Sequence, residues 1–223
     1  MGSIRARRRR LYRVIRVNAS AVRTRRLAGL LTLSALMAAA AGAHAKASAH
    51  TTATRCDKSS LAPLKTLSDP QRRLVDLRPR RTTVRAINEL PTPRRTPTRR
   101  NNAFERHVWR VKAVIVMDRL KDDGDIQLIL LGGHSYLHAE LPSPACIPRR
   151  ARARAAMVRA RKHFEQGCGF PSRAWRHQGA VAYVSGVGFW HRPNQQPGHA
   201  KNYAGLHPVT GIKFLAGCDG EGR

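Results

Sequence analysis

Apolar side chains recur at every second position of residues 109–115, and this alternation is the strongest constraint on the fold. A period of two is typical of a strand with one buried face. The pair Asp123-Gly124 separates this stretch from a second apolar run at residues 126–131. An Asp-Gly pair between two apolar runs favours a hairpin, because the tight turn requires a positive φ. The sequence therefore predicts two antiparallel strands here.

Three more strands and one helix are expected after this hairpin. The apolar residues at 135–141, 181–187 and 209–215 predict the third, fourth and fifth strands. Residues 149–166 are expected to form a helix because four apolar side chains share one helical face: Ala153, Met157, Ala160 and Phe164.

Three strands, a helix and two strands in this order predict a mainly β, OB-like fold. Such a fold is a five-stranded Greek-key barrel, and here its helix would follow the third strand. A helix packed on an α+β sandwich is the alternative. In the OB-like arrangement residues 190–206 join the fourth and fifth strands, and OB-folds hold ligands with this loop. The proline and glycine in the loop exclude a continuous helix or strand there.

The N-terminal segment has the three-part layout of a secretory signal peptide. Residues 1–26 are rich in arginine and contain no acid, residues 27–42 are small and apolar, and Ala43-His44-Ala45 offers a cleavage site. The apolar run is short for a membrane span. We therefore expect removal of residues 1–45 and export to the periplasm or beyond, by the Sec or the twin-arginine route. A basic helix on the membrane surface is the alternative, and the block-wise arrangement of charge disfavours it.

The net charge of +29 is unevenly distributed along the chain. Residues 1–103 hold 24 of the 42 Lys and Arg residues but only 4 of the 13 Asp and Glu residues. The expected domain at residues 104–223 is therefore less basic than the total indicates. Residues 46–55 are expected to be a flexible tether, and residues 56–103 an N-terminal extension with one short capped helix at residues 84–90.

Four cysteines follow the signal peptide, and an even number in an oxidising compartment indicates two disulfides. Three connectivities are possible. Because Cys146 and Cys168 flank the expected helix, we expect that pair, which leaves Cys56 with Cys218. A structural zinc site is the alternative, and the lack of a Cys-x-x-Cys spacing disfavours it.

Several motifs follow one another along the chain. They are Lys65-Thr-Leu-Ser-Asp69, Thr82-Thr-Val84 with Leu90-Pro91, Asp123-Gly-Asp-Ile-Gln-Leu-Ile-Leu130, Ala139-Glu-Leu-Pro-Ser-Pro-Ala-Cys146, and a closing block of Gly198, Ala200, Asn202 and Leu206-His-Pro-Val209. In these motifs the chain resembles a family of exported bacterial proteins whose function is uncharacterised. The resemblance spans about residues 56–214 and implies that residues 56–103 pack on the barrel. It implies no activity.

Four positions depart from the pattern of that family. His191, Asn194 and Gly205 stand where the pattern has Asp, His and Glu, and Gln127 stands where it has His. The loop of this chain therefore lacks two carboxylates that would lie beside the histidines in relatives. The departures disfavour catalysis by this loop.

The loop between the last two strands is the predicted ligand site. Its aromatic rings would stack on a sugar or a base, although a tryptophan there would equally pin the loop to the barrel. The eight-residue spacing of its histidines fits no standard metal motif, so we expect no metal and no cofactor. The predicted ligand-binding residues are Trp190, His191, Gln196, Asn202, Tyr203 and His207.

Charged clusters offer two further candidates. The helix is rich in cations, and Arg150, Arg154 and Arg161 are the predicted polyanion-binding residues. A solvated helix face is the simpler interpretation. The acids near the hairpin turn predict a plain turn, because the twelve-residue calcium-loop pattern is absent: Asp118, Asp122, Asp123 and Asp125.

We therefore expect an exported, non-enzymatic binding module for an acidic polymer, a nucleic acid or a saccharide. The alternative is a hydrolase or nuclease with a histidine-based or metal-assisted site in the same loop. That alternative requires His191 or His207 within hydrogen-bond reach of a carboxylate such as Glu140. A binding module needs only an open surface of aromatic and amide groups.

Overall fold

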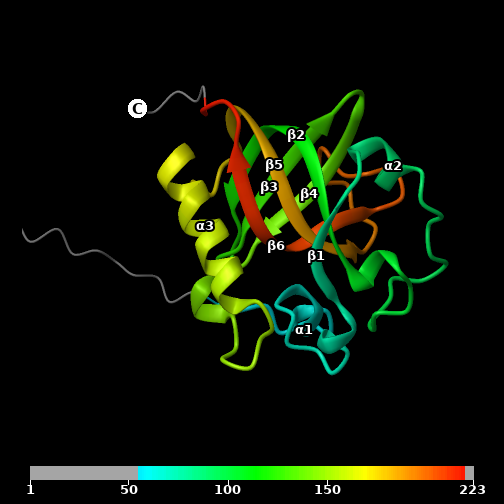
Figure 1. Ribbon diagram of the computed structural model, residues 1–223. Helices are drawn as coiled ribbons and strands as arrows, with labels where there is room; N and C mark the ends of the chain where they lie inside the picture. The colour runs from blue at the N-terminus through cyan, green and yellow to red at the C-terminus, as the bar shows by residue number, and fades with distance from the viewer. Residues whose placement is uncertain (1–54, 219–223) are drawn as a thin grey trace, which may run out of the picture. The chain divides into compact units, whose positions relative to one another are not determined.

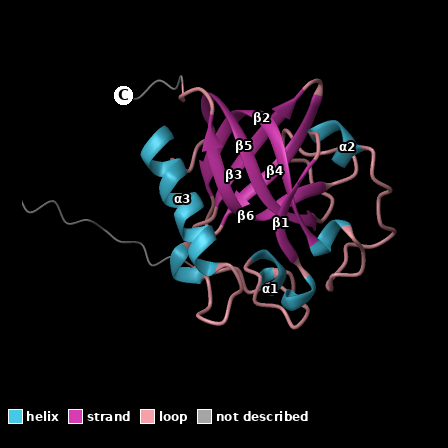
Figure 2. Ribbon diagram, in the orientation of Figure 1, coloured by secondary structure: helices cyan, strands magenta, loops and turns pink. Residues whose placement is uncertain are grey.

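The computed structural model describes residues 55–218, which all lie within one compact unit, residues 50–223. The predicted signal peptide, residues 1–45, and nearly all of the predicted tether lie outside the described residues. The fold is mainly β, as predicted, and is built on one six-stranded sheet (Figures 1 and 2).

The sheet begins with the edge strand β1, and five more strands follow it. Its order is β1 (Asp76–Arg81), β2 (His107–Leu120), β3 (Ile126–Gly132), β4 (Ser135–Leu141), β6 (Ala204–Phe214) and β5 (Arg176–Trp190). The β1–β2 and β4–β6 pairs are parallel, and the other pairs are antiparallel. An additional antiparallel pairing joins β5 to β2. The pairings therefore lead from β2 through β3, β4, β6 and β5 back to β2.

The sheet has six strands where five were predicted. The five predicted strands correspond to β2 through β6, and the turn after β2 is the predicted Asp-Gly turn, with Gly124 at φ +78°. The extra strand, β1, comes from the N-terminal extension. Because β1 is charged, contains Pro79 and is mostly exposed, it lacks the alternation by which a half-buried strand is recognised.

Helices cover the sheet on two sides (Figure 1). The long helix α3 buries Met157, Ala160 and Phe164, three of the four residues of the predicted face. The fourth, Ala153, precedes the helix in a left-handed conformation, so the helix begins at Arg154 and not at residue 149 as predicted. In the extension, Thr83 caps α2 as predicted by accepting a hydrogen bond from the amide of Ala86 at 3.0 Å. No described helix is long and apolar enough to cross a membrane. The helices are α1 (Ala62–Lys65), η1 (Arg72–Leu74), α2 (Val84–Asn88), η2 (Phe104–Arg106), η3 (Pro144–Cys146) and α3 (Arg154–Cys168).

Two disulfides are present, but the predicted pairing is wrong. Cys56 is bonded to Cys146, and Cys168 to Cys218, with Cα–Cα distances of 5.4 and 5.2 Å. The helix between Cys146 and Cys168 has 15 residues, so its ends lie about 22 Å apart. Bonded cysteines need Cα atoms within about 7 Å of each other. A bond between Cys146 and Cys168, the last residue of the helix, would therefore require residues 147–153 to run back along the whole helix; instead Cys146 is bonded to Cys56 of the extension.

Candidate functional site

Two adjoining clefts lie between the β2–β3 turn and the loop that joins β5 to β6, residues 191–203. One has a volume of about 630 Å³ and the other about 340 Å³. We refer to the two clefts together as the groove. Four residues line both clefts: Asp57, Lys121, Asp123 and Gln196.

The N-terminal extension forms one wall of the groove. Its first turn is tied to η3 by the Cys56–Cys146 disulfide, and Lys65 pairs with Asp57 at 3.0 Å. Burial acts to raise the pKa of Asp57, but the amide of Ser59 and the Lys65 ammonium lower that pKa to about 2. This wall therefore carries a matched pair of charges at neutral pH.

The charges that line the groove leave an excess of cations. Each of its four carboxylates has a Lys or Arg partner: Asp57 with Lys65, Asp122 with Arg173, and both Asp123 and Glu140 with Lys121. Three arginines in the lining have no ion-pair partner among residues 55–218: Arg55, Arg119 and Arg192. The groove is therefore suited to an anionic ligand.

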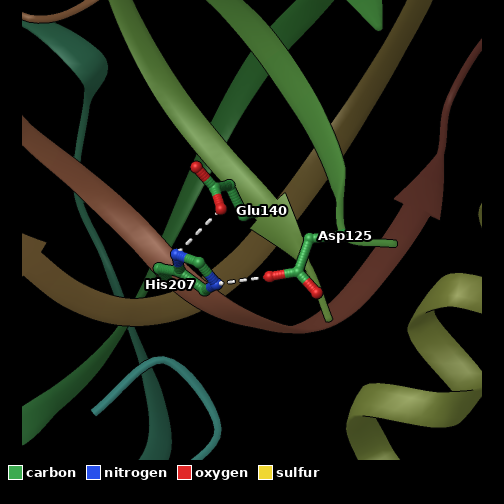
Figure 3. A group of neighbouring side chains, drawn as sticks. All are labelled: Asp125, Glu140 and His207. Carbon is green, nitrogen blue, oxygen red and sulfur yellow. Dashed lines mark ion pairs between the residues drawn. The ribbon is translucent and has the colours of Figure 1, made fainter. Parts of the chain in front are cut away.

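A buried cluster of one histidine and two carboxylates adjoins the groove through Glu140. Figure 3 shows its three side chains. The ring of His207 stands between two carboxylates, with Nδ1 3.2 Å from Oε2 of Glu140 and Nε2 3.4 Å from Oδ2 of Asp125. The side chain of His207 is fully buried, and neither contact has the alignment of a hydrogen bond. Of the three residues, only Glu140 lines the groove.

Strand pairing explains this arrangement. The parallel strands β4 and β6 pair His138 with Gly205 and Ala139 with Leu206. One residue further along both strands are Glu140 and His207, which therefore lie beside each other. Asp125 immediately precedes β3, and its Oδ1 accepts a hydrogen bond from the amide of Ser143 at 2.8 Å.

Lys121 links the buried cluster to the groove. Its ammonium lies 2.9 Å from Oε2 of Glu140 and 3.2 Å from Oδ2 of Asp123. Burial acts to lower the pKa of Lys121, but the carboxylates of Glu140 and Asp123 raise it above its usual value. Burial likewise acts to raise the pKa of Glu140, but His207 and Lys121 hold it well below its usual value. The cluster thus keeps an ionised carboxylate at the floor of the groove.

The same cluster has the donor types of a divalent-metal site. One ligand atom from each of Asp125, Glu140 and His207 lies within 4.8 Å of the other two. Imidazole and carboxylate together suit zinc and related ions. The Lys121 ammonium already contacts Glu140, so an ion bound there would have to displace a charge that neutralises this carboxylate.

Two more histidines, the buried His138 and the half-buried His191, are neutral at this end of the sheet. Burial lowers the pKa of His138, and it lowers the pKa of His191 well below the usual range. A Cβ atom at Gly205 would lie 2.2 Å from Nε2 of His191. The absence of a side chain at Gly205 therefore makes room for the imidazole of His191.

We expect His138 and His191 to make the folded protein less stable in mild acid. Because the folded-state pKa values of His138 and His191 lie below the usual 6.5, protons bind the unfolded chain first as the pH falls. The free energy of unfolding should therefore decrease from about pH 6.5 downwards, until the pH passes the folded-state values. Urea unfolding at pH 7.5 and 5.5 tests this, and the decrease should be smaller in His138→Gln and His191→Gln. An unchanged decrease in both variants would contradict the assignment.

The predicted ligand residues fall into three groups. Trp190, Asn202 and His207 are buried. Asn202 donates to the carbonyls of Ile87 and Leu90 at 2.8 and 2.9 Å, so this amide holds the loop on α2. His191 and Gln196 line the groove. Tyr203 is neither fully buried nor part of the groove lining: its ring stacks on that of His199, another residue of the loop, with a centroid distance of 4.9 Å.

The predicted polyanion residues do not act together. Arg161 is buried, pairs with Glu165 at 2.8 Å and donates to the carbonyl of Gly124 at 2.7 Å. Its inclusion in an exposed cationic face was therefore wrong. Arg150 and Arg154 are exposed, but neither lines the groove.

The contact of His207 with Glu140 was named from the sequence only as a requirement of the hydrolase alternative. The place of Asp125 in the cluster and the unpaired arginines of the groove were missed. The expectation that the loop histidines have no carboxylate beside them was wrong for His207, because Asp125 and Glu140 come from outside the loop. The signal available for these carboxylates was the short connection between the second and third predicted strands, residues 126–131 and 135–141. Antiparallel pairing of these strands places Asp125 and Glu140 near the same end. Comparisons with known proteins add no assignment, since neither a protein-family model nor a curated protein matches this chain.

Proposed function

We propose that the chain is an exported binding module that holds an anionic polymer in the groove. The single observation that carries this proposal is the charge balance of the lining. Every carboxylate there is paired, whereas Arg55, Arg119 and Arg192 are not. The polymer is recognised by repeated oxoanions, as found in a nucleic acid or an acidic saccharide.

An OB-like barrel is the architecture that we infer for this function. Its support is the order of three strands, a helix and two strands in β2–β6, the parallel β4–β6 pair, and the return pairing of β5 with β2. OB-folds bind oligonucleotides and oligosaccharides with the loops after their first and fourth strands. The groove lies between the corresponding loops, after β2 and after β5.

Export is part of the same proposal. Its support is the signal-peptide layout of the N-terminus together with two disulfides, which persist in oxidising compartments. The resemblance to exported bacterial proteins stays a prediction that points the same way.

Binding to two polyanions tests the function. Fluorescence anisotropy with a labelled single-stranded oligodeoxythymidylate, and competition with polygalacturonate, distinguish a nucleic acid from an acidic saccharide. The double variant Arg55→Gln/Arg192→Gln should bind the preferred polymer about tenfold more weakly at low salt, because two contacts are lost. For a single strand the salt dependence should also fall, by about 1.4 in the slope of log K against log[salt].

The exposed arginines outside the groove supply the matched control. Arg150→Gln/Arg154→Gln removes the same number of charges and should leave affinity almost unchanged. Equal losses in the two double variants would favour nonspecific attraction to the whole protein. Failure of the wild type to bind either polymer would refute the proposal.

A second candidate, a hydrolase, is favoured by one contact. The Nδ1 of His207 lies 3.2 Å from Glu140, which meets the geometric requirement for an acid–base or metal-assisted site. His207 itself is fully buried and does not line the groove, so its ring would act on substrate only through Glu140 or a bound ion. This separation makes binding the better supported function.

A phosphodiesterase screen with and without a chelator tests the hydrolase. Turnover that the chelator abolishes in the wild type, and that is lost in a folded His207→Gln variant, would establish it. Polymer binding without turnover would instead leave the binding module as the function. Thermal unfolding of the variant, measured by circular dichroism, ensures that lost turnover is not lost folding.

A further inference from the structure

Arg119 is held more rigidly than the other unpaired arginines of the groove. Its guanidinium carbon lies 4.4 Å from the centroid of the Trp175 ring, a cation–π contact. Its Nε donates a hydrogen bond to Oε1 of Gln127 at 2.9 Å. The plane of the guanidinium is thus fixed by one ring and one hydrogen bond.

The partner that fixes Arg119 is itself locked. Gln127 is fully buried, and its Nε2 donates to Oε1 of Gln196 at 2.7 Å and lies 3.2 Å from Nδ1 of His138. The other ring nitrogen of His138 lies 2.8 Å from the carbonyl oxygen of Pro197. Arg119 is therefore connected through β3 and β4 to the loop on the opposite side of the groove.

These contacts leave the end of the guanidinium open. Within residues 55–218 no hydrogen bond or ion pair occupies Nη1 or Nη2 of Arg119, and the residue lines the 630 Å³ cleft. An arginine whose plane is fixed loses less side-chain entropy when it binds. Its terminal nitrogens match the two oxygens of a phosphate or carboxylate.

We infer that Arg119 forms an oxoanion subsite that binds one phosphate or carboxylate group of the polymer through both terminal nitrogens. This inference rests on the proposed function for its biological ligand, but the subsite can be probed alone. The other cations of the same cleft lack this geometry: Arg173 and Lys121 already have carboxylate partners, and no ring or hydrogen bond among residues 55–218 fixes the guanidinium of Arg55. Arg119 therefore binds this group directly and fixes its orientation.

Isothermal titration of the mature protein with inorganic pyrophosphate tests the subsite. Arg119→Lys keeps the charge but loses the planar fork and the stacking, so affinity should fall about tenfold. Trp175→Phe should weaken binding less, because a smaller ring still supports Arg119. The control Arg159→Lys makes the same exchange on the exposed face of α3 and should leave affinity unchanged.

The outcomes separate the subsite from the proposed function. Undetectable binding of pyrophosphate to the wild type, or equal affinity in wild type and Arg119→Lys, would overturn the subsite. Polymer binding by the same samples would then show that the groove functions without it. Retained pyrophosphate binding without polymer binding would instead support the subsite and refute the polymer. Circular dichroism of each variant confirms that the fold is intact.

Discussion

Replacing Glu140 with glutamine is expected to lower the free energy of unfolding by about 3–5 kcal/mol. Glu140 is the carboxylate that faces both Lys121 and His207, and all three side chains are largely removed from solvent. Glutamine has nearly the same shape, so the substitution leaves packing in place and removes only the negative charge. Two buried cationic or polar groups then lose their common partner.

Urea unfolding at neutral pH measures the effect of Glu140→Gln. The matched control is Glu89→Gln, because Glu89 pairs with Arg85 at 2.7 Å on the surface of α2. An exposed pair four residues apart on a helix contributes only about 0.3–0.5 kcal/mol. A loss below 1 kcal/mol at Glu140 would mean that its attraction to Lys121 and His207 merely offsets the desolvation of the three groups.

The elements that could be predicted are those with a local signal. Strand β3 follows from an apolar run, β4 from a period of two, the turn from its Asp-Gly pair, and most of the apolar face of α3 from a period of 3.6. The long strand β2 was predicted only as far as Ile115. Its register shifts between Ile115 and Met117, and a bulge of this kind interrupts the alternation on which the prediction depended.

The candidate site was less predictable because its parts are far apart in the sequence. Asp57, Glu140 and Gln196 meet only through the order and register of the strands. Unpaired arginines cannot be recognised before their potential partners are placed, so Arg119 looked like any other basic residue. The loop was correctly located, but three of its six proposed contacts proved to be buried.

Removal of the Cys56–Cys146 disulfide is expected to affect both stability and binding. The bond closes a loop with a sequence separation of 90 residues, for which loop-closure entropy predicts a stabilisation of about 4–5 kcal/mol. It also holds the extension that carries Asp57 and Lys65 into the wall of the groove. Cys56→Ser/Cys146→Ser should therefore lower the midpoint of urea unfolding and weaken polymer binding while the six-stranded sheet remains folded.

The second disulfide provides the control that separates these two effects. Cys168 and Cys218 have a sequence separation of 50 residues, and neither lines the groove. Cys168→Ser/Cys218→Ser should reduce stability by a similar amount, about 4 kcal/mol, yet keep the affinity for the polymer. Equal losses of affinity in both double variants, measured well below their unfolding temperatures, would show that binding follows overall stability. Loss confined to Cys56→Ser/Cys146→Ser would locate the ligand against the wall formed by the extension.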